Sequence, residues 1–263
     1  MRLLFIGDVI GKSGRRIIQH LLPRIQKAFH VDFTVANVEN AAGGFGLTPQ
    51  VAKELLETGI DVMTSGNHIW DKKEIFEYIQ NTPQLLRPAN YPPGVPGRGM
   101  FIGSVSGGPK VAIINLQGRV FMPPLDCPFR LADTLLAEAL ATTRIVLIDF
   151  HAEATSEKIC FSRYVQGRAG AVVGTHTHVQ TADEQILPQG TAFITDVGMT
   201  GPHDSVIGVE YASSMQRFLL QIPRKYTTAE RDAKLHAVLI EMEEESGRAQ
   251  SIRRLSLSET WNP

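Results

Sequence analysis

Short apolar segments alternate with segments of helical periodicity along the first two thirds of the chain. Runs rich in apolar and β-branched residues predict buried strands at 3–6, 33–38, 61–65, 100–105, 111–116, 144–150 and 171–174. Between them, apolar residues recur at helical spacing and predict helices over 15–29, 48–57, 71–80, 131–140 and 156–166. Repeated strand–turn–helix units are typical of a mostly parallel sheet covered by helices. The pattern therefore predicts an α/β fold.

The last third of the chain has a different pattern. Residues 186–187 and 192–194 are expected to pair as a hairpin, and a helix is expected from Tyr211. Segments 196–199 and 201–204 are interpreted as loops that could carry site residues. Two amphipathic strands, 233–240 and 250–257, are expected to continue the central sheet into a second sheet. The chain contains no repeat and no change of composition that marks a linker, so a single domain over 1–263 is predicted.

Composition excludes several classes of protein. The 27 acidic and 26 basic residues nearly cancel, so neither stable nucleic-acid binding nor attraction to an anionic membrane is expected. Two separated cysteines, Cys127 and Cys160, provide no disulfide framework and fit a reducing compartment. The short apolar N-terminal run is unlike a signal peptide, and a cytoplasmic protein is expected. The sequence does not determine the oligomeric state, so a homo-oligomer remains open.

A Gly-Lys-Ser triplet near the N-terminus suggests a nucleotide-binding P-loop. That motif requires a second glycine five residues earlier, where this chain has Ile6. The glycines around Lys12 are therefore interpreted as a turn that leads into the first helix.

Polar residues follow the predicted strands at the points where they end, which is where α/β sheets bind ligands. Taken one at a time, each has an ordinary explanation, such as a turn cap or a hydrogen-bonded histidine. His176 and His178 are two residues apart, and in extended backbone such side chains point the same way. Because five strand ends agree, we predict a metal site at one edge of the sheet, formed by Asp8, Glu39, Asn40, Asn67, His151, His176 and His178. His68 follows the ligand Asn67 and is expected to lie beside the site without being a ligand itself.

Mixed nitrogen and oxygen ligands suit two divalent transition-metal ions that share a carboxylate. No serine nucleophile with a histidine base is recognisable, which excludes a covalent serine hydrolase. His203 is interpreted as a surface-loop residue that could face the site. His20, His30 and His236 are interpreted as structural or solvent-facing.

The order and spacing of these motifs resemble a known superfamily. After Gly7-Asp8 come Gly66-Asn67-His68, Asp149-Phe150-His151 and Gly174-Thr175-His176-Thr177-His178, as in the calcineurin-like metallophosphoesterases. That superfamily usually opens with Asp-x-His, but Val9 and Ile10 follow Asp8 here. It usually supplies a bridging aspartate where this chain has Glu39 and Asn40. This variant, with Val-Glu-Asn-Ala-Ala-Gly-Gly and Asp-Phe-His-Ala-Glu-Ala-Thr, is similar to the YmdB-like family of bacterial phosphodiesterases over essentially the whole chain.

The resemblance implies two sheets flanked by helices and a dinuclear metal site at the strand ends. One metal ion would bind Asp8, Glu39, Asn40 and His178, and the other would bind Glu39, Asn67, His151 and His176. Glu39 would bridge them, and Asn40 would replace the missing histidine. The shift toward oxygen ligands favours iron or manganese, with zinc or magnesium as alternatives.

The resemblance also implies hydrolysis of a phosphodiester, for which a 2',3'- or 3',5'-cyclic nucleotide is expected, with His68 as proton donor. A phosphomonoesterase or small-substrate nuclease with the same site stays open. So does a regulatory protein that binds a nucleotide and hydrolyses it slowly. We expect loops 87–98 and 199–204 to shape the specificity pocket, but the sequence does not identify the substrate.

Overall fold

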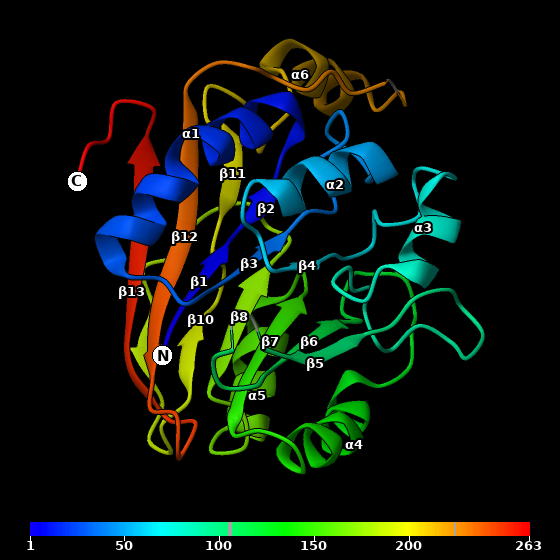
Figure 1. Cartoon of the computed structure of the whole chain (residues 1–263). Coiled ribbons are helices and arrows are strands. Elements are labelled where there is room, and N and C mark those ends of the chain that lie inside the picture. The colour runs from blue at the N-terminus through cyan, green and yellow to red at the C-terminus, as the bar shows by residue number, and fades with distance from the viewer. Residues whose placement is uncertain (105–106, 224) are drawn as a thin grey trace.

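Two β-sheets pack against each other, with helices on their outer faces (Figure 1). The computed structural model describes residues 1–104, 107–223 and 225–263. Both sheets are mixed, so the fold is α/β, as predicted. The first sheet has seven strands, in the order β2-β11-β12-β1-β3-β4, with β13 paired to β12. The second has six strands, in the order β5-β6-β7-β8-β10-β9.

The first sheet combines N-terminal and C-terminal strands. Its parallel part is β1 (Arg2–Ile6), β3 (Phe33–Asn37) and β4 (Val62–Thr64). β12 (Ala233–Met242) pairs antiparallel with β1, and β13 (Ala249–Ser258) pairs antiparallel with β12. The C-terminal strands therefore extend the first sheet, and the expectation that they lead into a second sheet is wrong. Two short strands, β2 (Asp8–Val9) and β11 (Met199–Pro202), pair in parallel at its edge, where segments 196–199 and 201–204 were expected to be loops.

The middle of the chain forms the second sheet. Its parallel strands are β6 (Val111–Gln117), β7 (Ile145–His151), β8 (Ala171–Thr175) and β10 (Ala192–Ile194). Antiparallel strands β5 (Met100–Gly103) and β9 (Gln185–Ile186) close its edges. The expected hairpin between β9 and β10 is confirmed. The predicted strand 100–105 ends earlier, at Gly103, and its last position lies outside the described residues.

Alternation along each strand divides the core into layers. On β1, Leu4 and Ile6 pack toward the helices, whereas Leu3 and Phe5 pack toward the other sheet. Strands buried on both faces need apolar side chains at nearly every position, which explains the continuous apolar runs in the sequence. One core therefore lies between the sheets, and a further core lies under the helices on each side.

Helices α1 (Gly11–Phe29) and α2 (Pro49–Glu57) cover the first sheet, and α4 (Pro128–Leu140) and α5 (Thr155–Val165) cover the second (Figure 1). Helices α3 (Ile75–Asn81) and α6 (Tyr211–Leu220) follow β4 and β11. The predicted start of α3 at residue 71 is wrong, because residues 71–74 form turns and Glu74 takes the N-cap position. Within the part of the chain that the structure describes, no helix combines the length and apolarity needed to cross a membrane.

Candidate metal centre

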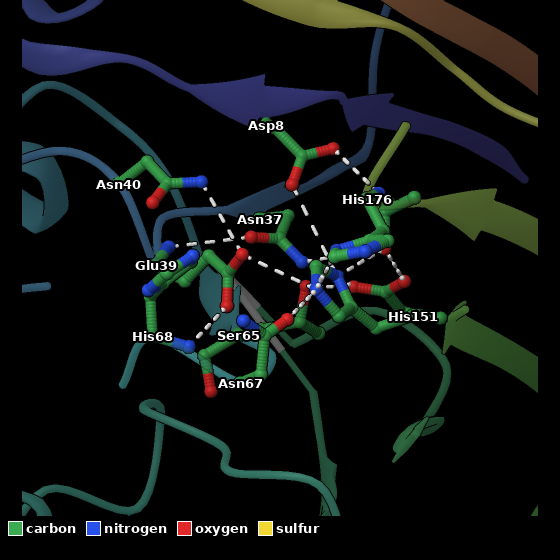
Figure 2. Close-up of polar contacts among 12 residues, drawn as sticks. Asp8, Asn37, Glu39, Asn40, Ser65, Asn67, His68, His151 and His176 are labelled. Atoms are coloured by element: carbon green, nitrogen blue, oxygen red, sulfur yellow. Dashed lines mark hydrogen bonds and ion pairs between the residues drawn. The ribbon is translucent and has the colours of Figure 1, made fainter. Parts of the chain in front are cut away.

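The polar strand ends of both sheets meet at one place. Asp8 follows β1, Glu39 and Asn40 follow β3, and Asn67 follows β4. His151 ends β7, and the histidines at 176 and 178 follow β8. The expected position at the edge of one sheet is therefore wrong: the cluster lies where the carboxyl ends of two packed sheets converge. Figure 2 shows Glu39 between Asn40 and His68 on one side and His151 on the other.

Four potential ligand atoms surround one point in this cluster. Nε2 of His151 lies 3.0 Å from Asn67 Oδ1 and 3.1 Å from His176 Nδ1. The same atom lies 3.2 Å from Glu39 Oε1. Glu39, His151 and His176 each offer a ligand atom within 4.8 Å of the others. A divalent metal ion takes nitrogen and oxygen donors of these kinds, so the group fits a cation.

Asp8, Asn40 and His178 form a second group beside the first. His178 Nε2 lies 3.9 Å from Asp8 Oδ1 and 3.5 Å from Asn40 Nδ2. Asp8 Oδ1 and Asn40 Oδ1 are buried without a hydrogen-bond partner among the residues that the structure describes. Buried oxygens of this kind are costly unless something binds them. A cation bound by this second group would satisfy Asp8 Oδ1. Asn40 directs its Nδ2 toward Glu39 and His178, at 3.2 and 3.5 Å, and a rotation of its amide would present Oδ1 to the cation instead. With that rotation the residues present fit two ions.

The pKa values of the cluster show how strongly its charges depend on one another. Burial disfavours the charged form of Glu39, but the charge and hydrogen bond of His151 outweigh it and lower the pKa to about 2. Burial raises the pKa of Asp8 despite the attraction of His178 and His151. Burial disfavours a charge on His151 as well, yet the carboxylates of Glu39 and Asp8 raise its pKa to about 9. Burial and the charge of His151 lower the pKa of His176 to about 3. The buried carboxylates thus require a neighbouring positive charge, which a divalent cation would provide.

Hydrogen bonds fix the orientation of the histidine rings. His151 Nδ1 lies 2.9 Å from Thr175 Oγ1, which donates to Asp149 at 2.7 Å. His176 Nε2 lies 3.0 Å from Glu153 Oε2. Such contacts occupy one ring nitrogen and leave the other for a cation. The supporting residues Asp149 and Glu153 are absent from the sequence-based prediction of the site. A carboxylate inside the apolar run 144–150 was the signal for Asp149, whose pKa burial raises to about 7.

The backbone of the two neighbouring histidines differs from the prediction. Strand β8 ends at Thr175, and φ is +99° at His176 and +66° at His178. The residues therefore lie in a left-handed turn, not in extended backbone, although both side chains reach the cluster. His178 Nδ1 lies 2.8 Å from the Ile207 carbonyl oxygen, which leaves Nε2 facing Asp8.

His68 is attached to the cluster through its backbone. Its N–H donates to Glu39 Oε2 at 2.9 Å, while its ring Nδ1 lies 2.8 Å from Asp71 Oδ2. Asp71, at the expected start of the predicted helix 71–80, orients this ring instead. Gly66, two residues before His68, lies against His151. A Cβ atom at Gly66 would stand 2.2 Å from the His151 ring, which explains the glycine in the Gly-Asn-His segment.

A cavity of about 290 Å³ opens beside the cluster. Glu39, His68 and His176 line its polar side. Its apolar side includes Phe45 and Tyr226, whose rings stack with centroids 6.1 Å apart. Among the described residues, those lining the cavity include neither of the loops 87–98 and 199–204 that were expected to shape it; segment 206–209 and helix α6 contribute instead.

His203, which was interpreted as a surface residue that could face the site, packs on another histidine. Its ring centroid lies 4.5 Å from that of His236, and its Nδ1 lies 3.0 Å from the Gly201 carbonyl oxygen. His203 is not among the residues that line the described cavity. His236 itself is buried, in line with its interpretation as a structural residue.

Comparison with known proteins identifies the family. Residues 4–255 match the family described as YmdB-like protein. A 2',3'-cyclic-nucleotide 2'-phosphodiesterase of Bacillus subtilis (strain 168) is 49% identical over 259 residues, covering 98% of each chain. The crystal structure of a hypothetical protein from Thermus thermophilus has a TM-score of 0.92 and 43% identity, covering 98% of this chain and 99% of that one. A crystal structure described as a novel phosphatase from Mycoplasma pneumoniae has a TM-score of 0.92 and 31% identity, covering 98% and 93%. The family expected from the motifs is confirmed: the chain belongs to the YmdB-like family.

Proposed function

We propose that this chain is a metal-dependent phosphodiesterase that hydrolyses small phosphodiesters, with 2',3'-cyclic nucleotides as the substrate class. One observation carries the proposal: Asn67 Oδ1, His176 Nδ1 and Glu39 Oε1 converge within 3.0–3.2 Å of His151 Nε2. The activity named for the Bacillus subtilis relative, at 49% identity over nearly the whole chain, supports the choice of a cyclic nucleotide over other diesters.

Two divalent cations would be held by two sets of ligands that share Glu39. One set is Asp8, Glu39, Asn40 and His178, and the other is Glu39, Asn67, His151 and His176. The oxygen donors of the first set favour iron or manganese over zinc, and the histidines of both sets favour a transition metal over magnesium. When bound, the cations supply Lewis-acid activation of the phosphoryl oxygens and of water.

His68 has the role of proton donor to the leaving oxygen. Asp71 supports this role, because its carboxylate lies 2.8 Å from ring Nδ1. That contact occupies Nδ1, so Nε2 is the ring nitrogen that would donate the proton. The His68 side chain remains partly exposed, at 32%, and the residue lines the cavity where a substrate would bind. A histidine side chain that borders the cavity is within reach of a bound substrate and can act as a general acid.

The cavity beside the cluster supports a substrate of nucleotide size. Its volume of about 290 Å³ lies at the small end of ligand pockets, which suits a single nucleotide. The stacked rings of Phe45 and Tyr226, with Phe218 nearby in the lining, offer an apolar aromatic surface for a base. We propose that the phosphodiester binds at the cluster and that the base contacts this aromatic side.

A phosphomonoesterase with the same site is the second candidate, favoured by the similarity to the structure described as a phosphatase. The two are separated by comparing bis(p-nitrophenyl) phosphate with p-nitrophenyl phosphate at saturating Mn²⁺ or Fe²⁺. We expect a higher kcat/KM for the diester, because the monoester carries an additional negative charge beside the buried carboxylates of the cluster. A clear preference for the monoester would contradict the proposed diesterase.

A further inference from the structure

The turn that carries His176 and His178 needs external support. Both residues have positive φ, at +99° and +66°, a region that residues with a side chain rarely adopt. Such a conformation persists only where surrounding contacts determine it. Thr177 lies between the two histidines, so its contacts indicate what supports the turn.

A buried carboxylate holds this turn at its centre. Asp196 Oδ2 accepts hydrogen bonds from the Thr177 backbone N–H at 3.0 Å and from Thr177 Oγ1 at 2.8 Å. Its other oxygen accepts from the Gly198 N–H at 2.8 Å. The backbone of Asp196 also bonds to Thr181, beyond the second histidine, through its N–H and its carbonyl oxygen. Asp196 thus anchors the chain at and after the turn.

Lys158 of α5 completes the support. Its Nζ donates to Asp196 Oδ2 at 2.8 Å, and the two side chains are 1% and 0% exposed. Burying two charges is costly, and a buried ion pair is weak grounds for stability on its own. This pair contacts neither the substrate cavity nor the candidate ligand atoms directly. Its hydrogen bonds nevertheless lead to the residue between the two histidines.

We propose that Asp196, held in place by Lys158, is a positioning residue that presents His176 and His178 to the cations through Thr177. The inference rests on the proposed metal centre. It predicts that loosening the contact between Thr177 and Asp196 weakens metal binding itself, before any substrate is present. Partners outside the immediate ligands commonly change metal affinity by about 10–100-fold.

Thr177→Val tests the contact with the smallest change, because valine keeps the branched shape and the backbone N–H but loses the hydroxyl. Chelator-treated protein is titrated with Co²⁺ and followed by visible absorption. We expect the Kd for Co²⁺ to rise about tenfold or more, with an altered absorption spectrum, and Thr177→Ser to restore both.

Thr195→Val is the matched control. It removes a comparable hydroxyl hydrogen bond, from Thr195 to Asp183, beside Asp196 in the chain, and leaves the contact between Thr177 and Asp196 in place. A merely structural role for Asp196 would lower the melting temperature of the metal-free protein but leave the Kd unchanged. If Thr177→Val binds Co²⁺ as tightly as Thr195→Val does, the inference is overturned.

A double variant, Asp196→Asn with Lys158→Met, removes both buried charges together and avoids leaving one unpaired. We expect its Kd for Co²⁺ to rise at least as much as that of Thr177→Val. A Kd for Co²⁺ equal to that of the wild type in the folded double variant would also overturn the inference. If the double variant does not fold, the Kd of Thr177→Val alone decides whether the inference holds. If the wild-type protein does not bind Co²⁺, that result contradicts the proposed metal centre itself.

Discussion

At the scale of single residues, the imidazole of His68 is separate from the candidate ligands. Only its backbone N–H bonds to Glu39, at 2.9 Å, whereas its ring pairs with Asp71. The side chain can therefore be removed without removing a ligand atom, which allows proton donation to be distinguished from metal binding.

His68→Ala should lose most activity toward a cyclic nucleotide and much less toward an activated nitrophenyl diester. A ribose alkoxide is a poor leaving group that needs a proton, whereas p-nitrophenolate leaves readily; a general acid commonly contributes about 10²–10⁴-fold. Kinetics on both substrates, with metal content measured in parallel, test this. A metal count that falls with the rate would make His68 a ligand, and an equal loss on both substrates would indicate charge stabilisation.

The sequence predicted the candidate ligands better than the residues that support them. Ligands follow apolar strands and have the side chains that metals bind, so position and chemistry both mark them. Asp71 contacts His68, and Glu153 contacts His176, only because turns bring these side chains together. The sequence pattern does not specify those turns. The positive φ at His176 was missed as well, because the residue types at 176–178 do not specify such a turn.

At the scale of elements, β12 carries a buried histidine that links stability to pH. His236 Nε2 lies 3.1 Å from Ser256 Oγ, while Nδ1 has no partner among the described residues. Burial, with the nearby His203 and Lys234, lowers the pKa of His236 to about 4, against only a small opposing effect of Asp196. Its folded pKa therefore lies below the unfolded value of about 6.5.

Because the unfolded state binds the additional proton, the stabilisation is complete above pH of about 6.5 and decreases as the pH falls toward about 4. Between pH 7 and pH 5 the loss from this residue should be about 2 kcal/mol. Urea unfolding at both pH values measures it. His236→Gln should lose less stability on acidification than the wild type, whereas the exposed control His20→Gln should behave like the wild type. Equal pH dependence in all three would show that His236 is not responsible.

Long strands buried on both faces were predicted well, since β1, β3 and β7 have continuous apolar runs. The short strands β2 and β11 were missed, because two to four residues that include Asp8, Gly201 and Pro202 carry no strand signal. Their pairing, with Asp8 beside Met199, depends on the packing of distant segments.

At the scale of the whole molecule, the candidate centre joins the two sheets. Strands buried on both faces have similar patterns in either sheet, so the sequence could not divide them between two sheets. Candidate ligands come from strand ends of both sheets, and bound cations would cross-link them.

Removing metal should therefore lower the melting temperature. A ligand at about 100 times its Kd stabilises the folded state by about 2.7 kcal/mol. For a chain of this size that corresponds to about 5–10 °C. Thermal unfolding of chelator-treated protein, with and without added Mn²⁺, measures the shift, and Mg²⁺ at the same concentration is the control for ionic strength. Identical melting temperatures with and without Mn²⁺ would contradict a cation bound between the sheets.

Elemental analysis of the purified wild type and of Glu39→Gln tests the central claim most directly. Glu39 alone is assigned to both cations, and glutamine keeps its shape while removing the charge. We predict about two transition-metal ions per wild-type chain and substantial loss of both in Glu39→Gln, with no loss in the exposed control Glu57→Gln. Two full equivalents of metal in Glu39→Gln, or none in the wild type, would contradict a dinuclear centre bridged by Glu39.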